Sequence, residues 1–261
     1  MNLYIMVDLE GISGIYDKEQ VSPSGTRYFE GRSFMTQDIN ACVEAAKEAG
    51  VNKVYIKDDH GPASTVIWEK LTSKLDYCIS GKNPENRMPG INDCDAVILL
   101  GYHSMAGTPN GILEHTISSE TNQNVWINGS KVGEIGIDSA IAGDFGKPVI
   151  MVSGDDKACG EAKALLPWVV TAEVKKAVGC FYAMLLPQEK ALALLREKVK
   201  EAVRNFSNAK PHVVAKPVKL RIEKCERVQL PYSGKPFIKI IDGRTFEVEG
   251  STVEEALYRC R

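Results

Sequence analysis

The sequence has no surplus of basic residues. Its Lys and Arg residues number 32 and its Asp and Glu residues 34, which gives a net charge of −2 over 261 residues. That balance leaves no basic surface for nucleic acid and no polybasic stretch for anionic lipid. No apolar run approaches the roughly 20 residues that cross a bilayer, and the apolar start at residues 1–7 is too short and too poor in basic residues for a signal peptide. We therefore expect a protein that binds neither nucleic acid nor membrane.

The seven cysteines are scattered, odd in number and without a CxxC pair. Neither a disulfide framework nor a zinc knuckle is indicated, and a reducing, cytoplasmic compartment is the expectation. The glycine-rich GxGxxG and GxxxxGK motifs of nucleotide-binding loops are also missing. The segment Gly11-Ile12-Ser13-Gly14 lacks the GxSxG spacing of a serine hydrolase. Nucleotide binding through a glycine-rich loop and catalysis by a serine nucleophile are therefore not indicated.

Short apolar runs alternate with helical patterns over much of the chain. Strands are predicted at residues 3–7, 53–56, 96–100 and 148–153. One amphipathic helix is predicted at residues 36–49, with Thr36 as its N-cap and Gly50 just past its end, and another at residues 135–145. Residues 13–34 show no clear period and are expected to form a long loop. Strands that alternate with helices favour an α/β fold, a mostly parallel doubly wound sheet with helices on both faces.

Residues 188–261 have a different pattern. The predicted elements there are an amphipathic helix at residues 188–206, strands at 211–222 and 237–248, and a helix that starts at a capping box of Ser251 and Glu254. We therefore divide the chain into a metal-binding α/β catalytic domain at residues 1–187 and a smaller α+β subdomain at 188–261, which is a candidate region for oligomer formation.

Side chains with metal-binding or acid–base chemistry follow the predicted strands. They are Asp8 and Glu10 after the first strand, His60 after the second, His103 after the third, and Asp155 and Asp156 after the last. In open α/β sheets, ligands bind beyond the carboxyl ends of the strands, and side chains at positions i and i+2 of an extended segment share a face. Glu134 follows a hairpin turn predicted at Asn128-Gly129 and is expected near the same edge.

Two imidazoles and three carboxylates form a ligand set that suits zinc, with manganese and iron as alternatives. The five candidate ligands are Asp8, Glu10, His60, His103 and Glu134. Five exceed the need of one open catalytic site, which favours two metals bridged by a carboxylate and hydrolysis by metal-activated water. Each residue alone also has a plainer interpretation as a turn residue, a packed histidine or a helix cap. A two-metal hydrolase of another amide or phosphate ester, and a non-catalytic metal-binding assembly protein, are the alternatives.

The segments around these residues match those of one protein family in order. They are residues 7–14, 32–41, 59–61, 101–108, 115–116, 127–129, 133–136, 153–156 and 242–248. With these segments the sequence resembles the zinc-dependent D-aminopeptidases associated with bacterial dipeptide-transport operons. The resemblance spans nearly the whole chain, and the ordered set is more specific than any single motif.

This resemblance implies that the same five residues hold two zinc ions per subunit. It also implies that His115 is the catalytic residue, either as the nucleophile or as a general acid and base. The expected activity is release of N-terminal D-amino acids, notably D-Ala, from short peptides such as D-Ala-D-Ala. The expected assembly is a homo-oligomer, a decamer of stacked rings that encloses its active sites. Preference for D-residues follows from the resemblance alone.

An aminopeptidase must also hold the free α-ammonium group of its substrate, and a carboxylate near the site suits that task. The candidates, in order of preference, are Asp155, Asp156, Asp138 and Glu120. Asp138 stands where the family more often has Asn, so this chain is expected to carry an extra negative charge near the mouth of the site.

Overall fold

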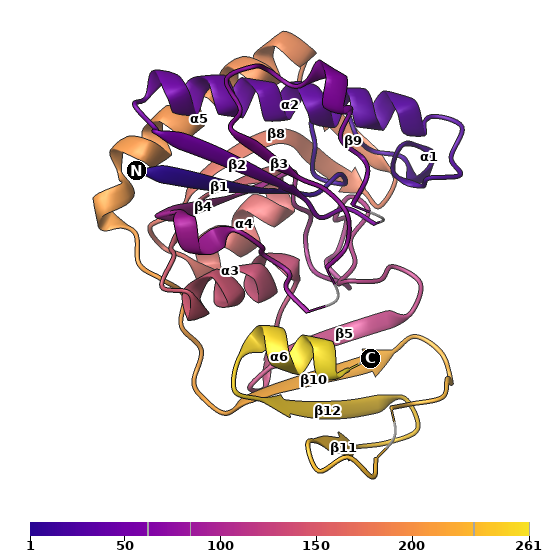
Figure 1. The fold of residues 1–261 in the computed structure, drawn as a ribbon. Coiled ribbons are helices and arrows are strands. Elements are labelled where there is room, and N and C mark those ends of the chain that lie inside the picture. Colours follow the sequence, from indigo (N-terminus) through magenta and orange to yellow (C-terminus); the bar gives the residue numbers. More distant parts are fainter. Residues whose placement is uncertain (62, 84, 232, 261) are drawn as a thin grey trace.

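The structure, a computed structural model, describes residues 1–61, 63–83, 85–231 and 233–260. Its larger layer is a seven-stranded sheet in the order β3-β2-β1-β4-β7-β8-β9 (Figure 1). The strands are β1 (Asn2–Val7), β2 (Lys53–Asp58), β3 (Tyr77–Ile79), β4 (Ala96–Leu100), β7 (Val149–Asp155), β8 (Val170–Gly179) and β9 (Tyr182–Leu185). All neighbouring pairs are parallel except β8 and β9. The predicted α/β fold with a mostly parallel sheet is confirmed.

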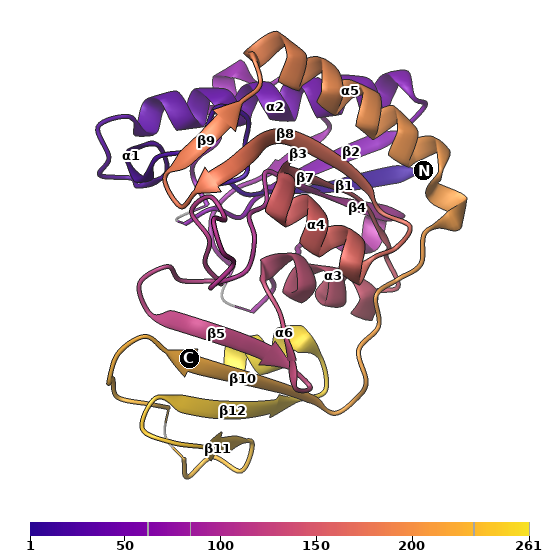
Figure 2. The same ribbon diagram turned by 180° about the vertical axis from the view of Figure 1, so that it is seen from behind.

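Helices cover both faces of this sheet (Figures 1 and 2). The helices are α2 (Tyr28–Glu48) and α5 (Gln188–Arg204) on one face, and α3 (Glu134–Asp144) and α4 (Asp156–Leu165) on the other. Along β1, Leu3 and Ile5 enter the core shared with α2 and α5, whereas Tyr4 and Met6 enter the core shared with α3 and α4. Successive side chains of a strand point to opposite faces. Burial on both faces explains why these strands are continuous apolar runs.

The segment at residues 13–34 is more regular than the sequence indicated. It contains the short helix α1 (Lys18–Val21) and the first turns of α2, which begins at Tyr28. The predicted N-cap at Thr36 is therefore wrong. The Thr36 hydroxyl instead donates to the Arg32 carbonyl within the helix, at 2.8 Å.

Gly31 explains why the early turns of α2 were missed. Glycine lowers helix propensity by roughly 1 kcal/mol relative to alanine, so it weakens the sequence pattern there. Packing nevertheless requires it, because a Cβ at Gly31 would lie 2.1 Å from the carbonyl oxygen of Gln20 in α1. The far end of α2 agrees with the sequence, since Gly50 follows it with a φ of +87°.

The smaller layer is an antiparallel sheet in the order β11-β12-β10-β5-β6. Its elements are β5 (Asn122–Ile127), β6 (Ser130–Lys131), β10 (Val218–Lys224), β11 (Ile238–Ile240), β12 (Thr245–Gly250) and helix α6 (Val253–Arg259). Helix α6 packs on β10 and β12 and contacts α3 of the larger layer (Figure 1). Contacts cross the predicted division at residue 187 in both directions, because β5 and β6 join the smaller sheet while α5 packs on α2. The apolar stripe of α5 predicts a buried face but does not specify which layer it covers.

The predicted elements of the C-terminal part are present, with shifted limits. The strand expected at residues 237–248 is divided by a turn, in which the Asp242 carboxylate accepts hydrogen bonds from the main-chain N–H groups of Arg244 and Thr245. The strand expected at 211–222 starts only at Val218. The described residues also form three short 3₁₀ helices: η1 (Trp68–Lys70), η2 (Ile91–Asp93) and η3 (Phe206–Asn208).

Local signals for turns and caps were partly right. At the hairpin turn, Asn128 and Gly129 have φ values of +50° and +85°, the left-handed values of a type I′ turn, as predicted. The final helix is capped by Thr252, whose side chain accepts from the N–H of Glu255, so the predicted box of Ser251 and Glu254 is wrong by one residue.

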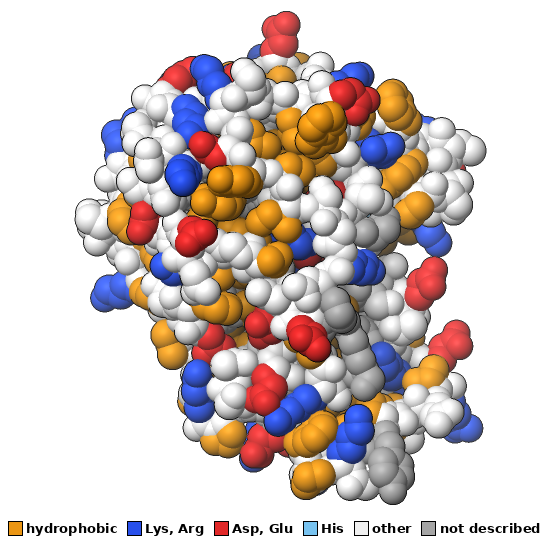
Figure 3. Space-filling view, viewed as in Figure 1, with side chains coloured by type: hydrophobic (Ala, Val, Ile, Leu, Met, Phe, Trp, Pro, Cys, Tyr) orange, Lys and Arg blue, Asp and Glu red, His pale blue; other side chains and the backbone are white. Residues whose placement is uncertain are grey.

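Charges of both signs are interspersed over both layers on the face drawn in Figure 3. This distribution agrees with the near balance of acidic and basic residues. Within the described part of the chain, no helix is both long enough and apolar enough to span a membrane.

Candidate active site

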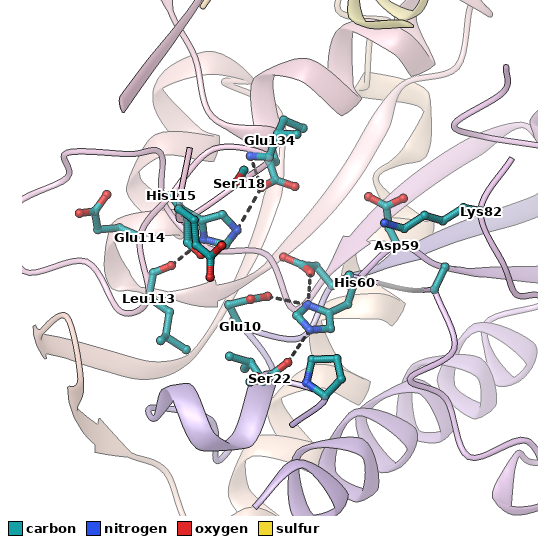
Figure 4. Close-up of a pocket in the computed structure, with 18 of the residues that line it drawn as sticks. Glu10, Ser22, Asp59, His60, Lys82, Leu113, Glu114, His115, Ser118 and Glu134 are labelled. Carbon is teal, nitrogen blue, oxygen red and sulfur yellow. Dashed lines mark hydrogen bonds and ion pairs between the residues drawn. The ribbon is translucent and has the colours of Figure 1, made fainter. Parts of the chain in front are cut away.

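The carboxyl ends of β1 and β2 open on a cavity of about 680 Å³. Six of the residues singled out from the sequence line it: Asp8, Glu10, His60, His115, Glu120 and Glu134. His103 lies beneath the lining and is only 1% exposed. Figure 4 shows Glu10, His60, His115 and Glu134 around one space. The sheet edge therefore gathers the five candidate metal ligands and the candidate catalytic histidine.

His60 joins the ends of β1 and β2. Its Nδ1 atom lies 3.3 Å from Oδ1 of Asp8 and 3.1 Å from Oε2 of Glu10. Its Nε2 atom lies 2.8 Å from the main-chain carbonyl of Val21. A carbonyl only accepts hydrogen bonds, so Nε2 carries a proton and donates it there. The Nδ1 atom is the nitrogen that faces the two carboxylates.

His103 follows β4 and connects Asp8 with Glu134. Its Nε2 atom lies 3.3 Å from Oδ2 of Asp8 and 3.3 Å from Oε1 of Glu134. Its Nδ1 atom lies 3.0 Å from the carbonyl of Ser104. Asp8 therefore directs one carboxylate oxygen toward His60 and the other toward His103, which places it between two groups of donor atoms.

His115 stands on a loop between β4 and β5. Its Nδ1 atom lies 2.8 Å from the Leu113 carbonyl, and its Nε2 atom lies 3.6 Å from Oε1 of Glu134. The main-chain N–H of Ile117 donates to the same Glu134 oxygen at 2.8 Å. Leu113 and Ile117 have φ values of +50° and +66°, a left-handed backbone that is unfavourable for β-branched Ile. Strained backbone of this kind often occurs at functional sites.

All three histidines follow one pattern. One ring nitrogen donates to a main-chain carbonyl, and the other faces carboxylates. Metal-binding histidines in proteins are typically oriented in this way by a partner on the second nitrogen. Two buried atoms of the site, Oδ2 of Asp8 and Nε2 of His103, also have no hydrogen-bond partner in the described structure. The donor atoms of Asp8, Glu10 and His103, and those of His103, His115 and Glu134, form two groups that each lie within 4.8 Å. These residues fit a cation.

The electrostatics of the site agree with that fit. Burial, followed by the charge of Glu10, raises the pKa of Asp8 to about 6. Burial also tends to raise the pKa of Glu134, but the His103 imidazole, whose Nε2 atom lies 3.3 Å from its Oε1 atom, holds it at about 2. Burial opposes protonation of His103, yet Glu134 raises the pKa of its imidazole to about 10. The carboxylates make the electrostatic potential of the site negative, and the raised imidazole pKa is a consequence of that potential. The same potential favours a bound cation.

Comparison with known proteins assigns the chain to a family. The family model described as D-aminopeptidase, peptidase family M55, matches residues 1–260. The chain belongs to the D-aminopeptidase family. Membership covers both layers of the fold and every candidate site residue.

Two comparisons with individual proteins agree with the family match. A D-aminopeptidase of Bacillus subtilis (strain 168) is 36% identical over 212 residues, which cover 81% of this chain and 77% of the relative. The solved structure of the Zn-dependent D-aminopeptidase DppA from Bacillus subtilis, described as a self-compartmentalizing protease, superposes with a TM-score of 0.93 at 33% identity. That match covers 100% of this chain and 95% of the solved chain. The two proteins therefore share one fold over nearly their full lengths.

Arg87 is a charged residue of the site that the sequence analysis did not predict. It lines the cavity, and its guanidinium lies 2.6 Å from Oδ2 of Asp59 and 3.6 Å from Oε2 of Glu134. Two further bonds of 2.5 and 3.0 Å join it to both oxygens of Asp138. Tyr102 donates to Asp138 at 2.8 Å. Arg87 comes from an irregular segment after β3, where no periodic pattern or motif marks it.

The four carboxylates considered for the substrate ammonium lie in different places. Asp155 is the N-cap of α4 and accepts from the N–H groups of Ala158 and Ile112. Asp156 pairs with Lys157 and accepts from Ala177 N–H, and Asp138 is fully buried against Arg87. Glu120 alone of the four lines the cavity. Glu114, which the sequence analysis did not single out, lines it as well (Figure 4).

Proposed function

We propose that this protein is a zinc-dependent aminopeptidase that releases N-terminal D-amino acids, notably D-Ala from short peptides such as D-Ala-D-Ala. The observation that carries the proposal is the common orientation of the three imidazoles, each with one nitrogen on a main-chain carbonyl and the other toward carboxylates. Family membership supports the reaction class. The zinc dependence of the structurally matched relative supports the choice of metal.

We infer that two zinc ions per subunit are held by Asp8, Glu10, His60, His103 and Glu134. Asp8 would serve both groups of donor atoms, because its two oxygens face His60 and His103 separately. Bound zinc supplies Lewis acidity, which polarises a peptide carbonyl and activates water. Manganese or iron would suit the same donors.

His115 moves a proton in the proposed reaction. The Leu113 carbonyl fixes the proton on Nδ1, which leaves Nε2 directed at Glu134 and the cavity. That nitrogen is placed to accept a proton and to return it to the leaving amine, the task of a general acid and base. Attack by Nε2 itself is the alternative, and trapping of a covalent acyl-enzyme would reveal it.

Glu120 binds the substrate's α-ammonium group in this proposal. It lines the cavity, whereas the carboxylates of Asp138, Asp155 and Asp156 are engaged by protein partners. Glu114 is partly engaged as well, since it accepts from the N–H of Gly107 at 2.5 Å. Recognition of a free ammonium explains why cleavage starts at the N-terminal residue.

The deciding experiment compares alanine release from D-Ala-D-Ala and L-Ala-L-Ala by one preparation as purified, after chelation and after zinc is added back. We expect activity on the D-dipeptide alone, lost on chelation and restored by zinc. Equal rates on both dipeptides would remove the stereochemical assignment. No release from either dipeptide, with zinc shown to be bound, would redirect the search to other amides and to phosphate esters.

We also propose a homo-oligomer, with ten subunits as the expected size. The support is that the matched relative is described as self-compartmentalizing. Size-exclusion chromatography with light scattering measures the subunit number. A stable monomer at working concentrations would overturn this part of the proposal and leave the catalytic part intact.

A further inference from the structure

Lys175 is a lysine enclosed within the larger layer. It lies in β8, is 1% exposed and follows Val174, which is also buried. In a regular strand, consecutive side chains point to opposite faces of the sheet, so Val174 and Lys175 would lie on different faces. The register between β7 and β8 shifts here, because Gly154 pairs with Glu173 whereas Asp155 pairs with Lys175. Such a β-bulge changes the direction in which the neighbouring side chain points, here that of Lys175.

All three donors of the Lys175 ammonium are used by one loop. Its Nζ atom donates to the main-chain carbonyls of Glu10 at 2.6 Å, Ile12 at 2.9 Å and Ile15 at 2.7 Å. These acceptors are neutral. Burial lowers the pKa of the Lys175 ammonium to about 8, and the nearby charges of Asp155 and Asp38 oppose that lowering. Three inward-facing carbonyls around a single positive charge resemble the oxygen shell of a bound monovalent cation.

The loop held in this way carries Glu10. Within a few residues the chain leaves β1, presents the Glu10 carboxylate to His60 and turns back at Ile15 toward α1. A second contact to this loop comes from α2, where Asp38 accepts from the N–H and the hydroxyl of Ser13 at 2.9 and 2.6 Å. Lys175 is the only cationic side chain that the described structure shows bonded to the carbonyls of residues 10–15.

We propose that Lys175 is a positioning residue for the metal site, whose ammonium fixes the loop at residues 10–15 and thereby sets the direction of the Glu10 carboxylate. The inference rests on the proposed function in one respect, that Glu10 is a metal ligand. It adds to that function a residue on a distant strand that controls metal affinity without touching metal or substrate.

The test is zinc affinity in Lys175→Met, measured by competition with a chromophoric chelator. Methionine keeps the length and burial of the side chain but removes the charge and the three donors. We expect a loss of about 10- to 100-fold in affinity, the range typical of residues that orient ligands. Lys224→Met is the matched control, because Lys224 donates to Asn122 in the smaller layer, and its zinc affinity should equal that of the wild type.

Chemical rescue separates positioning from a general packing role. In Lys175→Ala, ammonium or methylammonium ions should enter the vacated carbonyl shell and restore zinc affinity in a saturable manner. Tetramethylammonium, which has no N–H donor, should not restore it. A loss of affinity that ammonium does not reverse, or an affinity in Lys175→Met equal to that of the wild type, would overturn the proposal.

Hydrogen exchange tests the inference without zinc. In the metal-free protein, Lys175→Met should speed exchange of the amides of residues 11–15, while those of β4 keep their protection. If Lys175→Met does not fold, Lys175→Arg keeps the charge but cannot reproduce three short bonds from one nitrogen, and it should show the same local effect. Unchanged exchange would refute the positioning role. Failure of the wild type to bind zinc would instead refute the proposed function.

Discussion

The imidazoles of His103 and His115 stack on each other, with ring centroids 4.0 Å apart and ring planes inclined by 12°. Both rings direct Nε2 toward the same oxygen of Glu134, at 3.3 and 3.6 Å. His103 is enclosed, whereas His115 lines the cavity. This difference agrees with the proposed roles, in which His103 holds a cation and His115 meets the substrate.

Removal of His115, the member of this pair that lines the cavity, should affect catalysis more than metal binding. We expect His115→Ala to lower kcat by about 10²- to 10⁴-fold, the usual contribution of a general acid and base, with zinc content unchanged. Steady-state kinetics and metal analysis on the same samples measure both. His212→Ala, in the connection between α5 and β10, is the control and should behave as the wild type. Loss of zinc from His115→Ala would reassign His115 as a ligand.

Arg87 should contribute strongly to stability. Its side chain is 14% exposed, and Asp138 is not exposed at all. Arg87→Met leaves buried carboxylates without a counter-charge, which should cost about 3–5 kcal/mol of unfolding free energy. Denaturant unfolding measures this loss. The control is Arg221→Met, which breaks a pair with Glu247 whose arginine is 42% exposed and should cost less than about 1 kcal/mol. Equal losses in the two variants would contradict the buried-network interpretation.

Glu120→Gln tests recognition of the substrate ammonium. A charge-assisted hydrogen bond contributes about 1.5–3 kcal/mol, so KM for D-Ala-D-Ala should rise about tenfold or more while kcat changes little. Initial-rate kinetics separate the two constants. Glu189→Gln, in the first turn of α5, should leave KM unchanged. An unaltered KM in Glu120→Gln would move this task to another carboxylate of the cavity.

Asp38 should make stability depend on pH in the acid range. Burial raises its pKa from 3.8 to about 6, so the folded state holds this proton more tightly than the unfolded chain. The resulting stabilisation is full below the unfolded pKa and is lost as pH rises through about 6. The wild type should therefore lose up to about 3 kcal/mol relative to Asp38→Asn between about pH 4 and pH 7. Urea unfolding at several pH values measures the difference, and a constant difference would refute the assignment.

Two helical glycines should respond in opposite directions to alanine. Gly31→Ala brings a Cβ to 2.1 Å from the Gln20 carbonyl, so α1 and α2 must separate and the melting temperature should fall by several degrees. At Gly160 in α4 no atom lies within 4 Å of an added Cβ, and Gly160→Ala should stabilise the protein by up to about 1 kcal/mol. Differential scanning calorimetry measures both changes. A stable Gly31→Ala would show that the two helices accommodate the added methyl group.

The gathering of the candidate ligands at one edge of the sheet was predictable, because most of them follow strands that the apolar pattern marks. Asp8, His60 and His103 each follow a buried apolar run, and parallel strands bring their carboxyl ends to one edge. The first turns of α2 were not predictable, because Gly31 weakens the helical pattern and its necessity becomes visible only beside Gln20.

Residues that support the cluster escaped the sequence analysis for a different reason. Arg87 meets Asp138 across 51 positions from an irregular segment, and no local pattern encodes that contact. Lys175 lies in β8, where a bulge interrupts the alternation of side chains between the two faces of the sheet. Its inward direction depends on the pairing of β8 with β7, which no local pattern specifies. Asp155 was singled out from the sequence but has another role in the structure. A carboxylate at the end of a strand suits both a binding residue and a helix cap, and Asp155 is the N-cap of α4.

The contact between Lys175 and the Glu10 carbonyl joins positions 165 residues apart in sequence. During synthesis on the ribosome, β1 and the Glu10 loop emerge long before β8 exists. The last of the five candidate ligands is Glu134. A nascent chain therefore carries all five before Lys175, which binds the loop at residues 10–15, has been translated. The contact that fixes the Glu10 loop therefore forms late in synthesis. Truncated translation products that end before residue 175 lack this contact.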